Sequence, residues 1–434
     1  MLQTTSAALA AGDRLRVGAP LVLCDLTQSY SPAGGGGIST YLREKRDYVL
    51  RETPHHLIQI VPGPEDRVTV EGRHIFAEVG ADPVRGSPNY RFILRTGVVR
   101  ALLAQYRPDI IESLCPWVLP WTAIRHRRAF PDTALVAGYR TDFPNAHVYR
   151  VAAEKFGERL GRGFRWLSYG YAEITYREFD WVYTLSEAAR VPLAARGIHQ
   201  TSVLPLGVDT ALFCPTRRDP GYRAELGLPQ GRGPLLAYAG RIDNEKRADR
   251  LVAMFRRLPP ELDAAMVLIG DGKLRAPLTE AARGLPIAFP GFEKDRAELA
   301  RALASSDIYV SAMADETFGV SVLEAQASGL PVVGVSGGAM PDRVPAGMGL
   351  LGPVDDVATM ADNVARVWAS DPRGMGQAAR DMVAARYGWT RTFQRLFDEV
   401  YPNALAVSAD RVERRRASRF ASGRPMLSAD MATA

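Results

Sequence analysis

The sequence predicts an α/β protein built of two similar halves, each a parallel sheet with helices between its strands. Three observations support this prediction. The chain has 434 residues, a length that suits two or three domains. Short apolar runs alternate with helical patterns over residues 18–208, and the alternation restarts over 233–385. Between these stretches, residues 209–232 are rich in proline, glycine and arginine, as expected of a linker.

The first half is expected to begin after residues 1–17, which are small and polar and therefore predicted to be flexible. A buried strand at 20–25, a turn ending in four glycines and a helix from Ile38 form the start of a βαβ unit. The helix is indicated by apolar side chains at Ile38, Tyr41 and Leu42, with charged residues between its apolar positions. Further strands of this half are expected at 56–61, 109–112, 134–139, 181–185 and 202–205.

The second half repeats the pattern without close sequence repetition. Its strands are expected at 235–239, 266–269, 287–289, 308–311 and 332–335. Helical patterns lie between them, which favours a second parallel sheet. Residues 386–402 hold a further helical segment, and the arginine-rich tail at 403–434 is expected to be a solvated helix or disordered.

Composition bounds the class of protein. A hydrophobic content of 47% and a charged content of 24% are typical of a soluble globular protein. The net charge of +6 favours an anionic partner, either a phosphate ligand or a lipid surface, and nucleic acid is not expected. The three cysteines are far apart and lack CxxC spacing, so we expect a reducing cytosol and neither disulfides nor zinc. No signal peptide is recognisable, and no apolar run approaches the ~20 residues that span a bilayer.

The most informative segment contains two glutamates eight positions apart, Glu316 and Glu324. Glu316 precedes a predicted helix and follows a strand, at the sheet edge where open α/β sheets bind ligands. The backbone N–H groups near Phe318, Gly319 and Val320 form a positive helix start that suits a diphosphate. Glu324 is placed to accept hydrogen bonds from a ribose. The alternative is a pair of ordinary surface glutamates, which the surrounding Phe-Gly and Gly-Leu-Pro sequences disfavour.

Two cations follow the first strand of the second half. Arg241 and Lys246 lie in the loop after residues 235–239, where they could stabilise the charge that develops on a departing nucleoside diphosphate. Such a cluster is cationic where a metal would sit, so no metal site is predicted. A solvated charge run is the alternative. Gly270 belongs to a G-x-G turn after the next strand, a pattern that is weak by itself.

The first half offers two candidate elements. Gly36 and Gly37 end the four-glycine turn, where the backbone could approach a phosphate closely; the alternative is a flexible turn. Arg140 and Asp142 follow the strand at 134–139 within the sequence GYRTDFP. Asp142 is a candidate polar contact or, equally, an Asx-turn residue before Phe-Pro.

Together these segments resemble family 4 of the retaining glycosyltransferases, which have the GT-B fold. The E-x7-E segment matches closely, and the Arg241 to Lys246 loop resembles the family's G-R-x(n)-E-K element. The resemblance extends over about residues 235–335, although Lys273 stands where the family usually has proline. It implies two Rossmann-like domains facing across a cleft: an acceptor domain at 18–208 and a nucleotide-sugar domain at 233–385. The helix in 386–402 is implied to cross back to the first domain.

The resemblance also implies roles for the residues. Glu316 would face the sugar hydroxyls, Glu324 the ribose, and Arg241 with Lys246 the leaving diphosphate of a UDP- or GDP-linked donor, which is a substrate; no cofactor is expected. The GYRTDFP segment resembles the family's Y-H-T-D-F-P element, but Arg140 replaces the usual histidine. Arginine cannot act as a base, so Arg140 either binds an acidic sugar or a phosphate, or marks weakened catalysis.

The acceptor is indicated by a basic and aromatic stretch at 149–171 in the first half. Basic side chains interleaved with aromatics suit an anionic membrane interface, although ordinary solvated helices share the pattern. Combined with the resemblance, this predicts a bacterial lipid glycosyltransferase of glycolipid biosynthesis, peripheral on the cytoplasmic face of the membrane. Its reaction would move a hexose-type sugar to an acceptor hydroxyl with retention.

Other functions remain open at this point. A GT-B nucleotide-sugar epimerase would convert the donor without an acceptor. A non-catalytic nucleotide-sugar-binding protein is motivated by Arg140. A dehydrogenase is disfavoured, because no complete G-x-G-x-x-G with a downstream ribose-binding acid occurs in the expected place.

Overall fold

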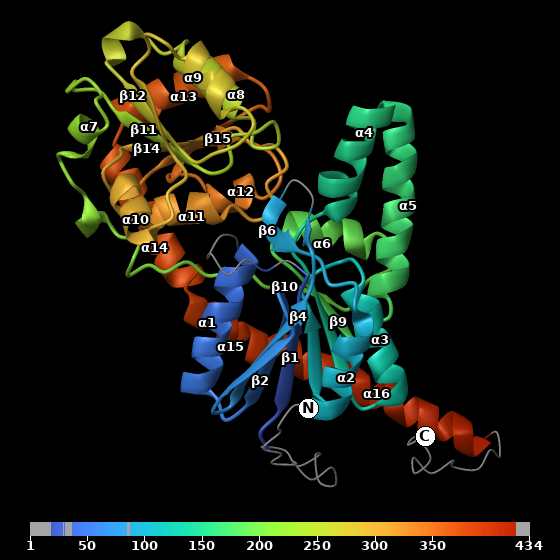
Figure 1. Cartoon of the computed structure of the whole chain (residues 1–434). Helices are drawn as coiled ribbons and strands as arrows, with labels where there is room; N and C mark the ends of the chain where they lie inside the picture. The colour runs from blue at the N-terminus through green and yellow to red at the C-terminus, as the bar shows by residue number, and fades with distance from the viewer. Residues whose placement is uncertain (1–18, 29, 31–36, 85–86, 422–434) are drawn as a thin grey trace.

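The structure is a computed structural model that describes residues 19–28, 30, 37–84 and 87–421. It contains two α/β units (Figure 1), with the last helices of the chain running back from the second unit across the first. The predicted fold class is confirmed. The predicted domain limits, 18–208 and 233–385 with a linker at 209–232, stay predictions. Residues 1–17 and Gly36 lie outside the described residues.

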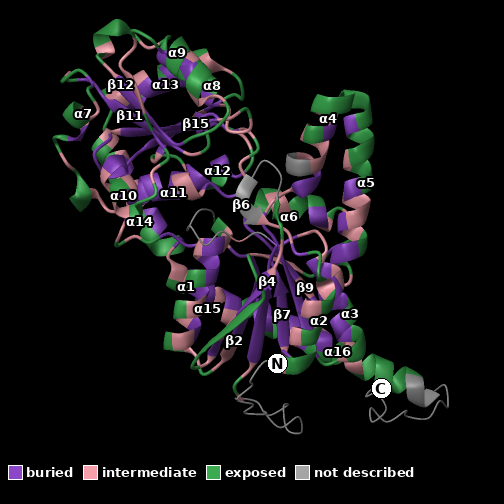
Figure 2. Ribbon diagram, in the orientation of Figure 1, coloured by how far each residue is buried: buried purple, intermediate pink, exposed green. Residues whose placement is uncertain are grey.

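The first unit is organised around an eight-stranded sheet with the strand order β10-β9-β8-β7-β1-β2-β4-β3. Neighbouring strands pair in parallel, except that β3 is antiparallel to β4 at the edge. The strands are β1 (Val22–Leu26), β2 (His56–Gly63), β3 (Arg67–Glu71), β4 (His74–Gly80), β7 (Ile110–Ser113), β8 (Ala134–Tyr139), β9 (Trp181–Thr184) and β10 (Thr201–Val203). The central strands are buried along their whole length (Figure 2), as expected when helices cover both faces of a parallel sheet.

Helices and a small ribbon complete this unit. A two-stranded antiparallel ribbon is formed by β5 (Pro83–Val84) and β6 (Ser87–Arg91). The helices are α1 (Gly37–Glu52), α2 (Thr96–Tyr106), α3 (Leu119–Ala129), a π-helical turn at Pro144–Tyr149, α4 (Arg150–Phe156), α5 (Glu158–Tyr176) and α6 (Glu187–Ala194). The α4–α5 hairpin stands out from the rest of the unit (Figure 1).

The second unit has a six-stranded, fully parallel sheet with the order β13-β12-β11-β14-β15-β16. Its strands are β11 (Leu235–Ala239), β12 (Ala265–Ile269), β13 (Ile287–Gly291), β14 (Ile308–Ser311), β15 (Val332–Val335) and β16 (Gly349–Gly352). Its α-helices are α7 (Tyr222–Glu225), α8 (Ala248–Phe255), α9 (Arg275–Ala281), α10 (Arg296–Ala304), α11 (Val320–Ala327), α12 (Met340–Arg343), α13 (Val357–Ala369) and α14 (Pro372–Arg386). Short 3₁₀ turns occur at Pro215–Arg217 and Pro260–Leu262.

The C-terminal helices tie the two units together. They comprise α15 (Trp389–Arg395), a π-helical turn at Leu396–Val400 and α16 (Tyr401–Ala421). Phe393 packs against Tyr41 of α1 with ring centroids 5.5 Å apart, and the Tyr401 hydroxyl donates to Glu112 Oε2 at 2.7 Å. The predicted crossover to the first domain is therefore confirmed.

Residues 403–434 were expected to be a solvated helix or disordered. The structure has a helix that continues to Ala421, but it is not fully solvated, because Ser408 is buried on the first unit. Arg411 anchors this stretch, since its Nε donates to Asp180 Oδ1 at 3.0 Å. Strands β3 to β6 and β16 were also not anticipated. All five residues of β3 are exposed, so the alternation that identifies a half-buried strand is absent.

Candidate functional site

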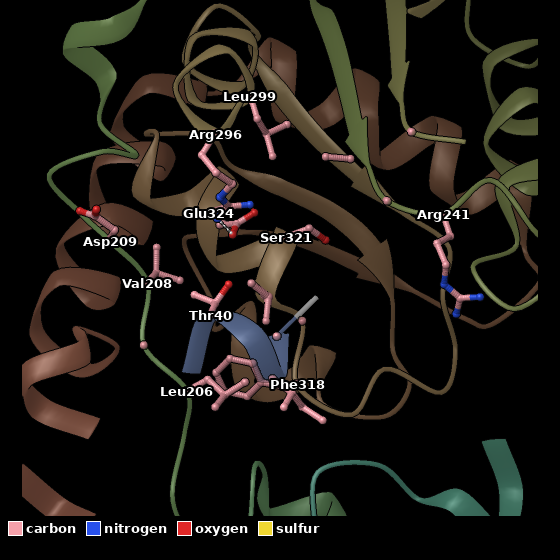
Figure 3. Close-up of a pocket in the computed structure, with 18 of the residues that line it drawn as sticks. Thr40, Leu206, Val208, Asp209, Arg241, Arg296, Leu299, Phe318, Ser321 and Glu324 are labelled. Atoms are coloured by element: carbon pink, nitrogen blue, oxygen red, sulfur yellow. Dashed lines mark hydrogen bonds and ion pairs between the residues drawn. The ribbon is translucent and has the colours of Figure 1, made fainter. Parts of the chain in front are cut away.

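A cavity of about 760 Å³ lies between the two units and is lined by residues of both. The first unit contributes the start of α1 and the end of β8, including Gly37 and Arg140. The second contributes the loops that follow β11, β12 and β14 at the carboxyl edge of its sheet. The cavity therefore lies where ligands bind to open α/β sheets. Figure 3 shows part of its lining.

The start of α11 forms the floor of the second unit's share of the cavity. Gly319 precedes the helix with a φ of 82°, a left-handed conformation that favours glycine. This turn brings the backbone N–H of Gly319 to Glu316 Oε1 at 3.0 Å. Phe318, Gly319, Val320 and Ser321 all line the cavity, so the positive end of the helix faces it.

Lys246 and Glu316 meet at this floor. The Lys246 ammonium donates to Glu316 Oε2 at 3.0 Å and lies 2.9 Å from the Met313 sulfur. The two residues come from different loops, after β11 and β14, which are neighbours in the sheet. The structure thus brings together a cation, a carboxylate and a helix start that the sequence had assigned separately.

Arg241 lines the same cavity but does not join this contact. Its guanidinium forms ion pairs with Asp243 at 2.5 Å and with Glu245 at 2.6 Å. Glu245 also pairs with Arg150 of α4 at 3.1 Å, which links the two units. Figure 3 places Arg241 on the opposite side of the pocket from Glu324. A diphosphate held by both cations would require Arg241 to leave Glu245.

Glu324 lies in the first turns of α11 and is only 4% exposed. One of its oxygens accepts a hydrogen bond from Arg296 at the start of α10 (Figure 3). Burial raises the pKa of the Glu324 carboxyl, while the charge of Arg296 opposes that shift. Sequence reasoning missed Arg296, because it lies 28 positions away with no motif to connect it.

The glycine candidates have different outcomes. Gly270 lines the cavity with a φ of 149°, and a Cβ built there would lie 1.9 Å from the Gly240 carbonyl oxygen. Only glycine therefore allows the loops after β11 and β12 to touch. Gly37 also lines the cavity, whereas Gly36 falls outside the described residues.

Asp142 and Arg140 are adjacent in sequence but differ in placement. Arg140 is buried in the cavity wall, whereas Asp142 is not among the lining residues. The Asp142 carboxylate accepts hydrogen bonds from the hydroxyls of Tyr139 at 2.7 Å and Tyr169 at 2.8 Å, and from the Asn145 side chain. The structure thus does not bring Asp142 to the other candidate residues, and its carboxylate holds α5 against β8.

Arg343 is a positioning residue that the sequence did not reveal. It is buried, and its Nε donates to the Phe318 carbonyl at 2.7 Å. The same guanidinium donates to the Tyr387 hydroxyl at 2.7 Å and to the Leu185 carbonyl of the first unit at 3.2 Å. Arg343 therefore fixes the backbone beside α11 against both units. Phe292 and Trp389 also line the cavity, Phe292 as an exposed ring.

Two features of the described residues bear on other expectations. Among them, no three His, Cys, Asp or Glu side chains are grouped as a metal site would require. Metal-free chemistry stays a prediction. None of the helices in the described ranges combines the length and the apolar character needed to cross a bilayer.

This fold and site define a class. Two parallel α/β units with a shared cavity, and a helix start with acids and a cation beside it, form the GT-B arrangement. Residues 35–212 match the sequence profile described as "Glycosyltransferase Family 4", and 233–370 match "Glycosyl transferases group 1".

Individual relatives are also glycosyltransferases. The chain is 32% identical to a "GDP-mannose-dependent alpha-(1-6)-phosphatidylinositol dimannoside mannosyltransferase" of Mycobacterium tuberculosis (strain ATCC 25177 / H37Ra), over 70% of this chain and 76% of the relative. It is 29% identical to a "GDP-mannose-dependent alpha-mannosyltransferase" of Mycolicibacterium smegmatis, over 83% and 92%. The fold is similar to sucrose-phosphate synthase from Thermosynechococcus elongatus, with a TM-score of 0.70 and 21% identity over 88% of this chain and 100% of that one.

The chain therefore belongs to glycosyltransferase family 4. It is a retaining glycosyltransferase that moves a sugar from a nucleotide-sugar donor to an acceptor hydroxyl.

Proposed function

We propose that the protein transfers a hexose from a UDP- or GDP-linked donor to a hydroxyl of a lipid at an anionic membrane surface. The observation that carries the proposal is the convergence of Lys246, Glu316 and the start of α11 on one cavity between the two units. The name of the Mycobacterium tuberculosis relative includes GDP-mannose and a phosphatidylinositol dimannoside, which supports a nucleotide-linked hexose and a lipid acceptor.

In the proposed reaction, the diphosphate lies against the start of α11 and the Lys246 ammonium. These groups stabilise the negative charge that develops on the leaving phosphate. Glu316 holds hydroxyls of the sugar, and Glu324 with Arg296 beside it holds the ribose. Arg241 supplies a second cation once it leaves Glu245.

The remaining roles follow from the same cavity. Gly37 and Gly270 let the backbone approach the donor. At the start of α11, the N–H groups of Phe318 and Gly319 donate to Glu316 and hold its carboxylate in place, and Val320 faces the diphosphate with the positive end of the helix. Residues 233–385 bind the donor and 18–208 the acceptor, and closure of the cavity excludes water that would hydrolyse the donor. The donor is consumed as a substrate, and the proposal includes no separate cofactor.

The membrane contact is assigned to the α4–α5 hairpin. Leu160, Phe164, Leu167 and Ile174 recur along α5 at helical spacing and are exposed, and Trp166 is 71% exposed. Basic side chains on the same hairpin are exposed beside them: Lys155, Arg159 and Arg162. Figure 2 shows exposed residues along much of this projecting hairpin. Apolar side chains flanked by cations suit insertion into an anionic lipid surface.

Co-sedimentation with liposomes tests this assignment. The wild-type protein should pellet with phosphatidylglycerol vesicles at low salt and remain in solution with phosphatidylcholine vesicles. Substituting Phe164 and Leu167 together with Glu should abolish pelleting. The matched control is Val70→Glu, since Val70 is also exposed but lies on β3. No binding of the wild type to anionic vesicles at low salt would refute the membrane contact.

Product analysis tests the reaction itself. The purified protein is incubated with GDP-mannose or UDP-glucose, with and without vesicles that contain phosphatidylinositol, and products are identified by mass spectrometry. The proposal expects a glycosylated lipid whose new linkage has the anomeric configuration of the donor. Sugar conversion without an acceptor would instead identify an epimerase, and nucleotide binding without conversion of any donor would identify a binding protein.

A further inference from the structure

Arg140 occupies an unusual position in the wall of the cavity. Its guanidinium stacks on the ring of Tyr41, 3.8 Å from the centroid, and its Nη2 donates to the Tyr183 hydroxyl at 2.9 Å. Tyr183 can approach because position 138 is glycine: a Cβ on Gly138 would lie 2.6 Å from the Tyr183 hydroxyl oxygen. These contacts hold the guanidinium in place, and Arg140 as a whole is only 8% exposed.

Glu112 carries a carboxylate of the same cluster, but that carboxylate cannot complete the hydrogen bonding of Arg140. Glu112 accepts from Tyr41 at 2.8 Å and Tyr183 at 2.6 Å through one oxygen, and from Lys45 and Tyr401 at 2.7 Å through the other. Four donors match the roughly four lone-pair sites of a carboxylate. Burial raises the pKa of Glu112, but Lys45 and Arg140 lower it to about 2, so the carboxylate is charged and fully engaged.

Two nitrogens of Arg140 are left over. Within the described part of the chain, its Nε and Nη1 are buried without a hydrogen-bond acceptor. Buried polar groups in folded proteins are nearly always hydrogen-bonded, and an exception calls for an explanation such as a bound ligand, an ion or water. Because Arg140 lines the cavity between the two units, the missing acceptor is expected to arrive there.

We propose that Arg140 is a specificity-determining residue that binds an oxyanion carried by a substrate in the cavity, either a carboxylate on the transferred sugar or a phosphate on the acceptor. The inference rests on the proposed function, since it concerns substrates of the same site. A planar guanidinium binds a carboxylate or a phosphate through neighbouring N–H groups. Nε and Nη1 lie on different edges of the group, so a pair of parallel bonds combines one of them with the second N–H of Nη2, whose other N–H donates to Tyr183. The donor's diphosphate is not this oxyanion, because Lys246 and the start of α11 are assigned to it.

Paired substrates separate the two sources. In the donor arm, kcat/KM is compared for UDP-glucuronic acid and UDP-glucose, and for GDP-mannuronic acid and GDP-mannose. In the acceptor arm, inositol 1-phosphate is compared with inositol. In one of the two arms, we expect kcat/KM for the charged substrate to exceed that for its neutral counterpart by about tenfold or more. This is the effect of a hydrogen bond to a charged group. Arg140→Gln should remove the preference while leaving the affinity for free UDP and GDP unchanged.

Two further variants control for structure. Arg140→Lys keeps the charge and should retain part of the preference, and Arg283→Gln alters an exposed arginine of the second unit and should change nothing. If Arg140→Gln does not fold, the wild-type comparison decides alone. The assignment of Arg140 would be overturned if the wild type binds UDP or GDP normally but shows no preference for the charged substrate in either arm. An equal loss of UDP and GDP affinity in Arg140→Gln would also overturn it. Failure of the wild type to bind either nucleotide would instead overturn the proposed function.

Discussion

Lys246 and Glu316 are 70 positions apart in the sequence, yet the ammonium of one donates to the carboxylate of the other at 3.0 Å. The second oxygen of Glu316 accepts from the backbone N–H of Gly319 at 3.0 Å. The carboxylate is therefore fixed on both sides, by a cation from the β11 loop and by the start of α11. A group held this way is preorganised, and catalysis by positioning depends on such preorganisation.

Replacing Glu316 with Gln should lower kcat by about a hundredfold or more, because misplacing a substrate by an ångström costs that much. The amide would place an N–H hydrogen-bond donor against the Lys246 ammonium, so the side chain would hold the sugar less firmly. Steady-state kinetics with the best donor would measure the effect. Glu280→Gln, on an exposed glutamate paired with Arg283, is the control and should leave kcat unchanged. Undiminished turnover in Glu316→Gln would remove the role assigned to this residue.

Glu245 is predicted to compete with the donor for Arg241. Changing Glu245 to Gln breaks the Arg241 pair at 2.6 Å and the Arg150 pair at 3.1 Å. The guanidinium, then paired with Asp243 alone, should bind a diphosphate more readily. UDP or GDP affinity should therefore rise about two- to fivefold, the range of a solvent-accessible ion pair. Isothermal titration would show this, with Glu187→Gln as a remote control. Weaker binding would mean that Glu245 supports the site instead.

Tyr401 is predicted to hold the C-terminal helices on the first unit. Its buried hydroxyl donates to Glu112, so Tyr401→Phe leaves a charged acceptor with one partner fewer. We expect the free energy of unfolding to fall by about 1–3 kcal/mol. Urea unfolding would measure it, and Tyr106→Phe, in a half-buried tyrosine of α2, gives the comparison. Equal stability of Tyr401→Phe and the wild type would contradict this account of the crossover.

Stability should also depend on pH through His126. Burial lowers the pKa of His126 to about 4, and its Nε2 has no hydrogen-bond partner among the described residues. In the unfolded chain its pKa returns to about 6.5, so the unfolded state binds more protons between pH 6.5 and 4. This contribution is therefore complete above pH 6.5 and is lost as the pH falls toward 4. His126→Leu should make unfolding less pH-dependent in that window; identical pH dependence in both proteins would contradict the prediction.

The second unit could be predicted further from sequence than the first, for a physical reason. Gly270, Glu316 and Glu324 lie within short loops and helix starts, where strand, turn and helix patterns place a residue directly. The buried cluster of charged side chains inside the first unit depends on tertiary contacts instead. Lys45 is one of the charged residues between the apolar positions of the helix from Ile38, yet it is fully buried against Asp25 and Glu112.

The same limit explains the other differences. Asp142 follows a strand at the expected place, but the hydroxyl of Tyr169, 27 positions later, occupies its carboxylate. Arg296 and Arg343 act through residues far from them in sequence, so no local pattern marked them. Spacing predicts where a chain turns, and long-range packing decides what each side chain then meets.

The site is tested most directly by isothermal titration of the 434-residue protein with UDP and GDP in the presence of EDTA. We expect one of the two nucleotides to bind without a metal ion. We also expect Lys246→Met to weaken this binding about tenfold or more, while the affinity for the matching monophosphate changes little. A strict requirement for a divalent cation, or Lys246→Met binding as tightly as the wild type, would contradict the claim that the diphosphate rests on Lys246 and the start of α11.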